Sequence, residues 1–339
     1  MSNRLSLPSM LEILRQACIK DGYDFQVIDD YSKQLVRVAS GGMFFLTGTG
    51  RINAYPLNDA PAASVARDKV FTYQVLAKAG IGVPDYEYYF LHDAYRAVRG
   101  DGREREDIAA GAARIGYPLF VKPLDGSRGN LAEIVHTPEE LSLQIERIAP
   151  VHHGLILQRV LTGAEYRLFM IDDVALFLYR RKPPFFVGDG NRSVGDFLAE
   201  ENDDRVAQGL TPITLASPFL QKTLTDHGLT VDAPVAEGVH FPYLAAANIS
   251  AGGEITDYTE TVPAALADWG QGVLTALSLR IGAIDFFAPD GIGPPDDFDL
   301  IEVNSNPSLA GLVHTGREAT VERIWRLVCR KYFSEEHTP

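Results

Sequence analysis

The chain has 339 residues, of which 46% are hydrophobic and 22% are charged, a composition typical of a globular protein. It carries 45 Asp and Glu residues against 31 Lys and Arg residues, a formal net charge of -14. Proteins that bind nucleic acids need a basic surface for the phosphates, so this balance argues against a nucleic-acid partner. An anionic ligand is still compatible with this charge if basic residues gather in one site.

The two cysteines, Cys18 and Cys329, are too few for a disulfide framework or a zinc site. Their apolar, helical surroundings predict buried thiols. No apolar run in the sequence has the length of a secretion signal or a membrane span. We therefore expect a cytoplasmic protein with no membrane partner.

The N-terminal part is expected to form a small α/β unit, residues 1–66. Apolar residues at helical spacing predict a helix over 9–20, which Asp21 and Gly22 end. Alternating apolar residues then predict short strands at 25–29, 34–39 and 43–50. An amphipathic helix is expected over 62–80, followed by a strand within 81–90.

The rest of the chain alternates between strand and helix patterns. Further strands are expected at 117–123, 131–136, 155–161, 165–172, 174–182, 283–288 and 299–304. Further helices are expected within 94–116 and at 138–149, 192–202, 264–282 and 317–333. The long polar segment 203–262 gives no clear pattern. The alternation, with several hairpins, predicts an α+β (α/β) fold with mixed sheets.

Oxygen-bearing side chains near the C-terminus suggest a metal site. Asp285 lies in one expected strand, and Glu302 and Asn304 lie two residues apart in another, so these two point to the same face. Pairing of the two strands would bring three oxygen donors together, in a set that Mg²⁺ prefers. The alternative is that the carboxylates only mark strand ends at the surface.

Two lysines could contact phosphate oxygens. Lys69 lies near the start of a helix, and Lys122 ends a strand just before a loop that contains Gly126 and Ser127. A lysine ammonium is a compact charge suited to phosphate, and glycines let backbone N–H groups approach closely. The alternative for each lysine is an ordinary solvated side chain.

The segment QRVLTGAEYR, residues 158–167, combines a strand, a tight turn and a glutamate. The backbone of a strand edge would suit adenine, and the Glu165 carboxylate would suit ribose hydroxyls. A plain β-hairpin with a charged residue beside its turn is the alternative. Similarly, the run Arg180-Arg181-Lys182 could hold an anionic substrate or a transferring phosphate, or simply be a basic strand end at the surface.

The order of these groups along the chain resembles the ATP-grasp superfamily. The closer likeness is to the ATP-grasp domains of cyanophycin synthetases and bifunctional glutathione synthetases. It is carried by ARDKVFTYQVLAKAGIGVP, KPLDGSRGN, VGDGNRSVGDFLAEEN, ISAGGEITDYTETVPA and IGAIDFFAPD with LIEVNSNP. Two positions depart from the family pattern: Leu131 stands where a third glycine is common, and Gln158 where Glu is common.

The resemblance implies a role for each candidate residue. The fold would be two α+β lobes gripping ATP in an ATP-grasp domain at 67–333, with a flap at 115–160. Lys69, Lys122, Gly126 and Ser127 would contact the phosphates of ATP. Gln158, Arg159 and Leu161 would line adenine, and Glu165 would bind ribose. The metal ligands would be Asp285, Glu302 and Asn304, holding two Mg²⁺ ions, for which Mn²⁺ could substitute.

Arg181 and Lys122 would be the catalytic residues, with Arg181 beside an acyl phosphate. The implied activity is an ATP-dependent ligation of a small-molecule carboxylate to an amine, on amino acids or short peptides. A homodimer is compatible with the resemblance. Two other functions stay open: a kinase that phosphorylates a small molecule without joining an amine, and a nucleotide-binding partner without turnover.

Overall fold

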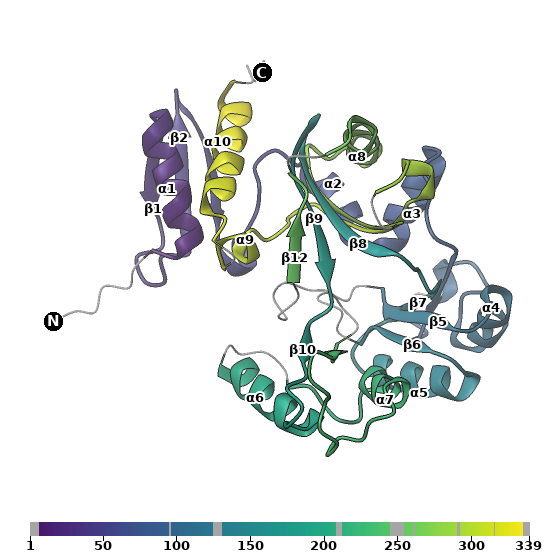
Figure 1. The fold of residues 1–339 in the computed structure, drawn as a ribbon. Helices are drawn as coiled ribbons and strands as arrows, with labels where there is room; N and C mark the ends of the chain where they lie inside the picture. Colours follow the sequence, from purple (N-terminus) through teal and green to yellow (C-terminus); the bar gives the residue numbers. More distant parts are fainter. Residues whose placement is uncertain are drawn as a thin grey trace.

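A computed structural model describes residues 7–94, 96–124, 131–207, 212–244, 254–259, 262–289, 292–314 and 316–334 (Figure 1). Helices and strands alternate along these residues and build separate antiparallel sheets of three, five, four and two strands. The α+β fold that the sequence predicts is confirmed. The expectation of mixed sheets, with parallel and antiparallel pairs, is wrong for the strands described. Every neighbouring pair is antiparallel, whether its strands are joined by a hairpin or by a longer connection.

The N-terminal unit is a three-stranded sheet covered by helices from both ends of the chain. Its strands, in the order β1-β2-β3, are β1 (Asp24–Val27), β2 (Leu35–Ser40) and β3 (Met43–Gly48). Helix α1 (Ser9–Asp21) packs beside α10 (Glu318–Ser334), which comes from the C-terminal end (Figure 1). Both cysteines are buried in these helices, as the sequence predicts. The division of the chain at residue 66 stays a prediction.

The helix expected over 62–80 is two helices, α2 (Ala60–Arg67) and α3 (Lys69–Lys78). The break lies at Asp68, whose backbone is extended at φ -97° and ψ 114°. The Asp68 carboxylate accepts hydrogen bonds from the backbone N–H groups of Val70 and Phe71, so it caps α3. Lys69 is therefore the first residue of a capped helix.

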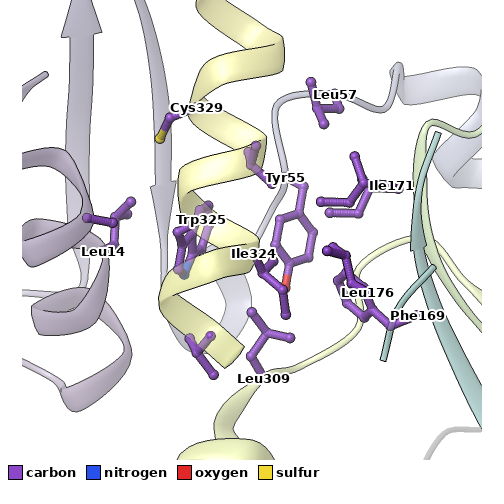
Figure 2. Close-up of a cluster of buried hydrophobic side chains, with 14 of the residues drawn as sticks. Leu14, Tyr55, Leu57, Phe169, Ile171, Leu176, Leu309, Ile324, Trp325 and Cys329 are labelled. Atoms are coloured by element: carbon purple, nitrogen blue, oxygen red, sulfur yellow. The ribbon is translucent and has the colours of Figure 1, made fainter. Parts of the chain in front are cut away.

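The five-stranded sheet has the order β12-β9-β8-β13-β14. Its strands are β8 (Ala164–Ile171), β9 (Val174–Lys182), β12 (Glu254–Asp257), β13 (Ile281–Ala288) and β14 (Asp299–Asn304). One face packs against α2, α3 and α8 (Ala264–Ala276) around buried Tyr166, Leu168 and Phe286. On the opposite face, part of β8 and β9 enters a second core (Figure 2).

That second core joins the five-stranded sheet to the N-terminal unit. Figure 2 shows Phe169, Ile171 and Leu176 of the sheet beside Tyr55 and Trp325. The Tyr55 hydroxyl donates to the carbonyl of Pro307 at 2.8 Å, so the ring is fixed as well as buried. Burial of large aromatic side chains is the main stabilising contribution here. The core covers only one end of this sheet face, because polar side chains occupy the other end.

The four-stranded sheet forms a second lobe with the order β4-β7-β5-β6. Its strands are β4 (Tyr86–Phe90), β5 (Leu119–Pro123), β6 (Glu133–Val135) and β7 (Gly154–Arg159). Helices α4 (Ile108–Ile115) and α5 (Pro138–Ile148) pack on it and enclose a core that includes Leu119, Leu141 and Leu157.

Residues 183–244 contain an insertion module with its own core. The helix expected over 192–202 is present in it, and the rest of the module lies mainly in the segment whose sequence gives no clear pattern. The module contains the strand pair β10 (Phe185–Val187) and β11 (His240–Pro242) and the helices α6 (Val194–Ala207) and α7 (Pro218–Asp226). Phe186 stacks on Phe197 and Phe241 with ring centroids 4.3 and 4.9 Å away. These aromatic contacts hold two short strands that are distant in the sequence.

Short elements complete the described chain: η1 (Gly50–Ile52), η2 (Arg96–Val98), η3 (Arg105–Asp107), η6 (Pro295–Asp297) and α9 (Ala310–His314). Among the helices of the described ranges, none is both long and apolar enough to cross a bilayer.

Candidate active site

The candidate site begins with polar side chains on one face of the five-stranded sheet. Arg167 of β8 lies in register with Asp285 of β13, and Asp285 lies in register with Glu302 of β14. Glu165 of β8 lies in register with Arg181 of β9. Side chains two residues apart on a strand share a face, so these residues and Asn304 point the same way. The expected pairing of the two C-terminal strands is confirmed.

Asp285 is the centre of an ionic cluster. It is only 1% exposed, and its two oxygens accept hydrogen bonds from Arg167 Nε at 2.5 Å and Arg167 Nη2 at 2.6 Å. Arg181 Nη2 lies 2.8 Å from the same carboxylate. Burial alone would raise the pKa of Asp285, but the charges of Arg167 and Arg181 outweigh it and lower the pKa. Asp285 is therefore no exposed strand end.

Glu165 and Arg181 extend this cluster. Arg181 is 5% exposed and forms an ion pair with Glu165 as well as with Asp285. Burial raises the pKa of Glu165 to about 7, although Arg181 opposes the shift. A buried carboxyl with a pKa near neutrality is typical of functional sites, although structural ion pairs shift pKa values too. In this structure the partner of Glu165 is a guanidinium.

Arg180 lies on the opposite face of the sheet. It is in register with Tyr166, which belongs to the core under α8, whereas Arg181 is in register with Glu165. The alternation expected for this pair of arginines is therefore present in the structure.

The lysines lie where the two lobes meet. Lys122 of β5 is 6% exposed, and its Nζ donates to the hydroxyl of Tyr73 at 3.4 Å. Tyr73 in turn donates to the carbonyl of Ile301 on β14 at 2.5 Å. Burial and the charge of Lys69 lower the pKa of Lys122 to about 7, while Glu302 opposes them. The charges of Lys69 and Glu302 thus both act on the pKa of Lys122, and buried Lys122 is not an ordinary solvated lysine.

The segment expected to line adenine connects the two lobes. Strand β7 ends at Arg159, so Leu161 lies between β7 of one sheet and β8 of the other, and not in a strand as the sequence predicts. The Arg159 side chain donates to Asp299 at 3.0 Å, at the start of β14. Gln158 is 1% exposed, and its Oε1 has no hydrogen-bond donor in the described part of the chain. A buried acceptor without a donor beside this connection is a feature that a ligand could satisfy.

Two predicted phosphate contacts, Gly126 and Ser127, lie outside the described residues.

One important residue of the site was not predicted from the sequence: Arg167, which makes the closest contacts to Asp285. The sequence does contain an indication of its role, because Arg167 stands two residues after Glu165 in a strand whose other side chains are mostly apolar. A half-buried arginine at that position is expected to have an acidic partner, but the sequence does not say which strand supplies it.

The donor set can be compared with the needs of a divalent cation. Asp285, Glu302 and Asn304 offer oxygen ligands, the kind that Mg²⁺ prefers, and Asn304 Nδ2 donates to Glu302 Oε1 at 3.1 Å. Within the described ranges, no group of three or more His, Cys, Asp or Glu side chains is arranged so that it could hold a metal ion by itself. The residues fit Mg²⁺ by chemistry, with Asp285 sharing its carboxylate with two guanidiniums.

Comparisons with known proteins agree with this architecture. No known family profile matches the sequence. The chain is 26% identical over 328 residues to the glutathione biosynthesis bifunctional protein of Mannheimia succiniciproducens, a match that covers 90% of this chain and 40% of that protein. It is 28% identical over 252 residues to the cyanophycin synthetase of a Nostoc species, covering 72% of this chain and 26% of that protein.

Among solved structures, the bifunctional glutathione synthetase of Pasteurella multocida superimposes with a TM-score of 0.59 and 22% identity. The superposition covers 97% of this chain and 44% of that one. The chain thus spans less than half the length of these relatives. It has the ATP-grasp fold, as expected. Its sequence is similar to ATP-grasp carboxylate–amine ligases over most of its length, which confirms the resemblance seen in the motifs.

Proposed function

We propose that this chain is an ATP-dependent carboxylate–amine ligase, which forms an amide bond through an acyl phosphate and releases ADP and phosphate. The observation that carries the proposal is the place of buried Lys122, which is bonded through Tyr73 to β14 of the other sheet. On β14, Glu302 lies opposite Asp285, which pairs with Arg181. The similarity to bifunctional glutathione biosynthesis proteins and cyanophycin synthetases favours amino acids or short peptides as substrates.

The lysines would hold the phosphates of ATP. Lys122 is buried against Tyr73 and is shifted toward its neutral form, so a phosphate oxygen would restore its charge. Lys69 at the capped start of α3 would add a second positive charge, together with the N-terminal end of the helix dipole. When bound to Asp285, Glu302 and Asn304, two Mg²⁺ ions would neutralise charge on the β- and γ-phosphates.

Arg181 would act on the substrate acid. A carboxylate is a poor electrophile, so its oxygen first attacks the γ-phosphate of ATP and an acyl phosphate forms. The guanidinium of Arg181, buried and next to Glu165, would hold the carboxylate and then the acyl phosphate as charge develops. The amine then attacks the carbonyl carbon, and phosphate leaves.

Water must be kept from this intermediate, because it would hydrolyse the acyl phosphate. The low exposure of Lys122, Arg181 and Asp285 supports a water-poor site between the lobes. The segment 158–161 would contact adenine, with Gln158 as the residue whose buried acceptor lacks a donor. Glu165 pairs with Arg181 through Oε1, so Oε2 would be the oxygen that accepts from ribose hydroxyls.

The test is a phosphate-release screen with amino acids and short peptides supplied singly and in pairs. A ligase releases phosphate only when an acid and an amine are both present, and mass spectrometry of the product shows a condensed compound. Formation of ADP without free phosphate, together with a phosphorylated product, would instead show a small-molecule kinase.

A further inference from the structure

The insertion module is attached to one edge of the five-stranded sheet. Its chain leaves from the end of β9 and returns into β12, and these strands are antiparallel neighbours in which Lys182 lies in register with Glu254. The two strands that flank the module in the sequence are therefore neighbours at one edge of the sheet. The module itself extends from this edge toward the four-stranded sheet (Figure 1).

The far end of the module packs against that second sheet. Helix α7 contacts β6, which is the edge strand of the four-stranded sheet, and it lies near α5 in Figure 1. The Glu133 carboxylate of β6 lies close enough to the backbone N–H of Phe219, in the first turn of α7, for that N–H to lower its pKa. First-turn N–H groups lack partners within a helix and favour negative charge, so a carboxylate at this place is favourable for α7.

Glu133 is buried and supported from its own lobe. It is 9% exposed, and Arg147 Nη1 of α5 lies 4.0 Å from its carboxylate. Arg147 also donates to Gln144 at 2.9 Å, and Gln144 donates to the carbonyl of Leu131 at 2.6 Å. Burial raises the pKa of Glu133, while Arg147 and the N–H of Phe219 oppose that shift. A buried carboxylate with these partners needs all of them to remain in place.

The contact also bears on the candidate site. Glu133 lies in register with Val121 of β5, so it is beside the strand residue that precedes Lys122. Lys122 in turn donates to Tyr73, which donates to the carbonyl of Ile301 on β14, the residue before Glu302. The two sheets are thus joined on one side by the connection between β7 and β8, and on the other side by the insertion module.

We propose that the insertion module is a strut between the two sheets, and that Glu133 is the positioning residue that fixes its far end. Through this contact the strut sets the angle between the sheets and so the distance between Lys122 and Glu302. This inference concerns the geometry of the two lobes and holds whether or not the chain is a ligase.

The test measures the distance between the lobes in the protein without nucleotide. Spin labels are placed on Ala110→Cys in α4 and Gln271→Cys in α8, both exposed positions, while the native Cys18 and Cys329 are buried. Double electron–electron resonance then gives the distance distribution between the four-stranded and five-stranded lobes. We expect a narrow distribution for the labelled parent and a distribution about twice as wide for Glu133→Ala, since local contacts of this kind restrain lobe motion.

Two further variants make the result specific. Glu133→Gln keeps an acceptor for the N–H of Phe219 but loses the charge, so we expect an intermediate width. Glu146→Ala removes an exposed carboxylate of α5 that pairs with Arg105 inside the same lobe, and it should leave the parental width. A parental width in folded Glu133→Ala, or equal broadening in Glu146→Ala, would overturn the proposal. If Glu133→Ala does not fold, a parental width in Glu133→Gln would overturn it.

Discussion

Arg167 and Asp285 lie directly opposite each other on β8 and β13, and the guanidinium donates a hydrogen bond to each carboxylate oxygen, at 2.5 and 2.6 Å. The Asp285 side chain is 1% exposed and that of Arg167 is 17% exposed. The planar fork of an arginine matches a carboxylate better than a lysine does, because two parallel hydrogen bonds fix its orientation. Asp285 is thereby held at the centre of the polar face, facing Glu302 on its other side.

Arg167→Met should destabilise the protein by about 3 kcal/mol, because Asp285 loses its closest partner while still buried. Asp285→Asn in the same chain should recover part of this loss, since the buried charge is then removed too. Urea unfolding of the two single variants and the double variant measures the coupling.

Arg280→Met is the matched control for this cycle. Arg280 donates to both oxygens of Asp172 at 2.9 Å, but that pair is about a quarter to a third exposed. Its loss should cost roughly 1 kcal/mol or less, as for surface pairs. Strictly additive effects of Arg167→Met and Asp285→Asn would contradict the interpretation of the buried pair.

Arg181→Ala should reduce turnover by about a thousandfold, the scale for loss of a group that stabilises transition-state charge. Arg180→Ala should change turnover by less than about tenfold, because Arg180 lies on the opposite sheet face, in register with Tyr166. ATP affinity should stay close to the parental value in both variants. Steady-state phosphate release and calorimetry give the two quantities, and equal losses of turnover would show that Arg181 has no special role.

Lys122 should take up a proton when ATP binds at pH 8. Its pKa is lowered to about 7 in the free protein, chiefly by burial, so at pH 8 most molecules carry a neutral lysine. Phosphate oxygens favour the charged form and raise the pKa, so up to about one proton enters per nucleotide, and this uptake should vanish near pH 5.5. Calorimetry in buffers with different ionisation enthalpies counts the protons.

The same lowered pKa has a consequence for stability. Because the unfolded chain has the ordinary lysine pKa of 10.5, unfolding takes up a proton between about pH 7 and 10.5, and Lys122 makes stability rise with pH in that window. Lys122→Met should remove both this dependence and the proton uptake on binding. Lys222→Met is the control, since Lys222 is an exposed residue paired with Asp226. A binding enthalpy independent of the buffer at pH 8 would show that Lys122 does not gain a proton.

Glu302→Gln should weaken the affinity for ATP with Mg²⁺ by about tenfold, while the affinity for ATP without metal changes little, because a carboxylate next to the phosphates is replaced by a neutral amide. Asp299→Asn is the control, since Asp299 lies on the same strand but pairs with Arg159. The measurement is calorimetric titration with and without Mg²⁺. Equal losses under the two conditions would exclude Glu302 as a metal ligand.

The sequence predicts the parts of the site that depend on local pattern. Asp285 and Glu302 could be placed opposite each other because their strands are close in the chain and pair as neighbours. The same holds for the opposite faces of Arg180 and Arg181, which follow from strand alternation alone. The break between α2 and α3 was not predicted, although Asp68 is a strong capping residue, because the apolar periodicity continues across it.

Other features depend on which distant segments become neighbours. Arg167 and Asp285 are far apart in the sequence, so their pairing needs the strand order of the sheet. The helix expected over 192–202 is present as α6, but the strands of the insertion module could not be predicted, because β10 and β11 have only three residues each and are separated by two helices. Its contact through Glu133 joins a β-strand to a helix some eighty residues away in the sequence, and no local pattern reports it.

The most direct measurement of the central claim is the substrate requirement for phosphate release by the purified chain with ATP and Mg²⁺. The ligase proposal predicts that phosphate and ADP appear only when a carboxylate and an amine are both supplied. It also predicts that the product mass equals the sum of the two substrates less one water. ADP that forms without an amine and without free phosphate, with a phosphorylated small molecule as the final product, would contradict it.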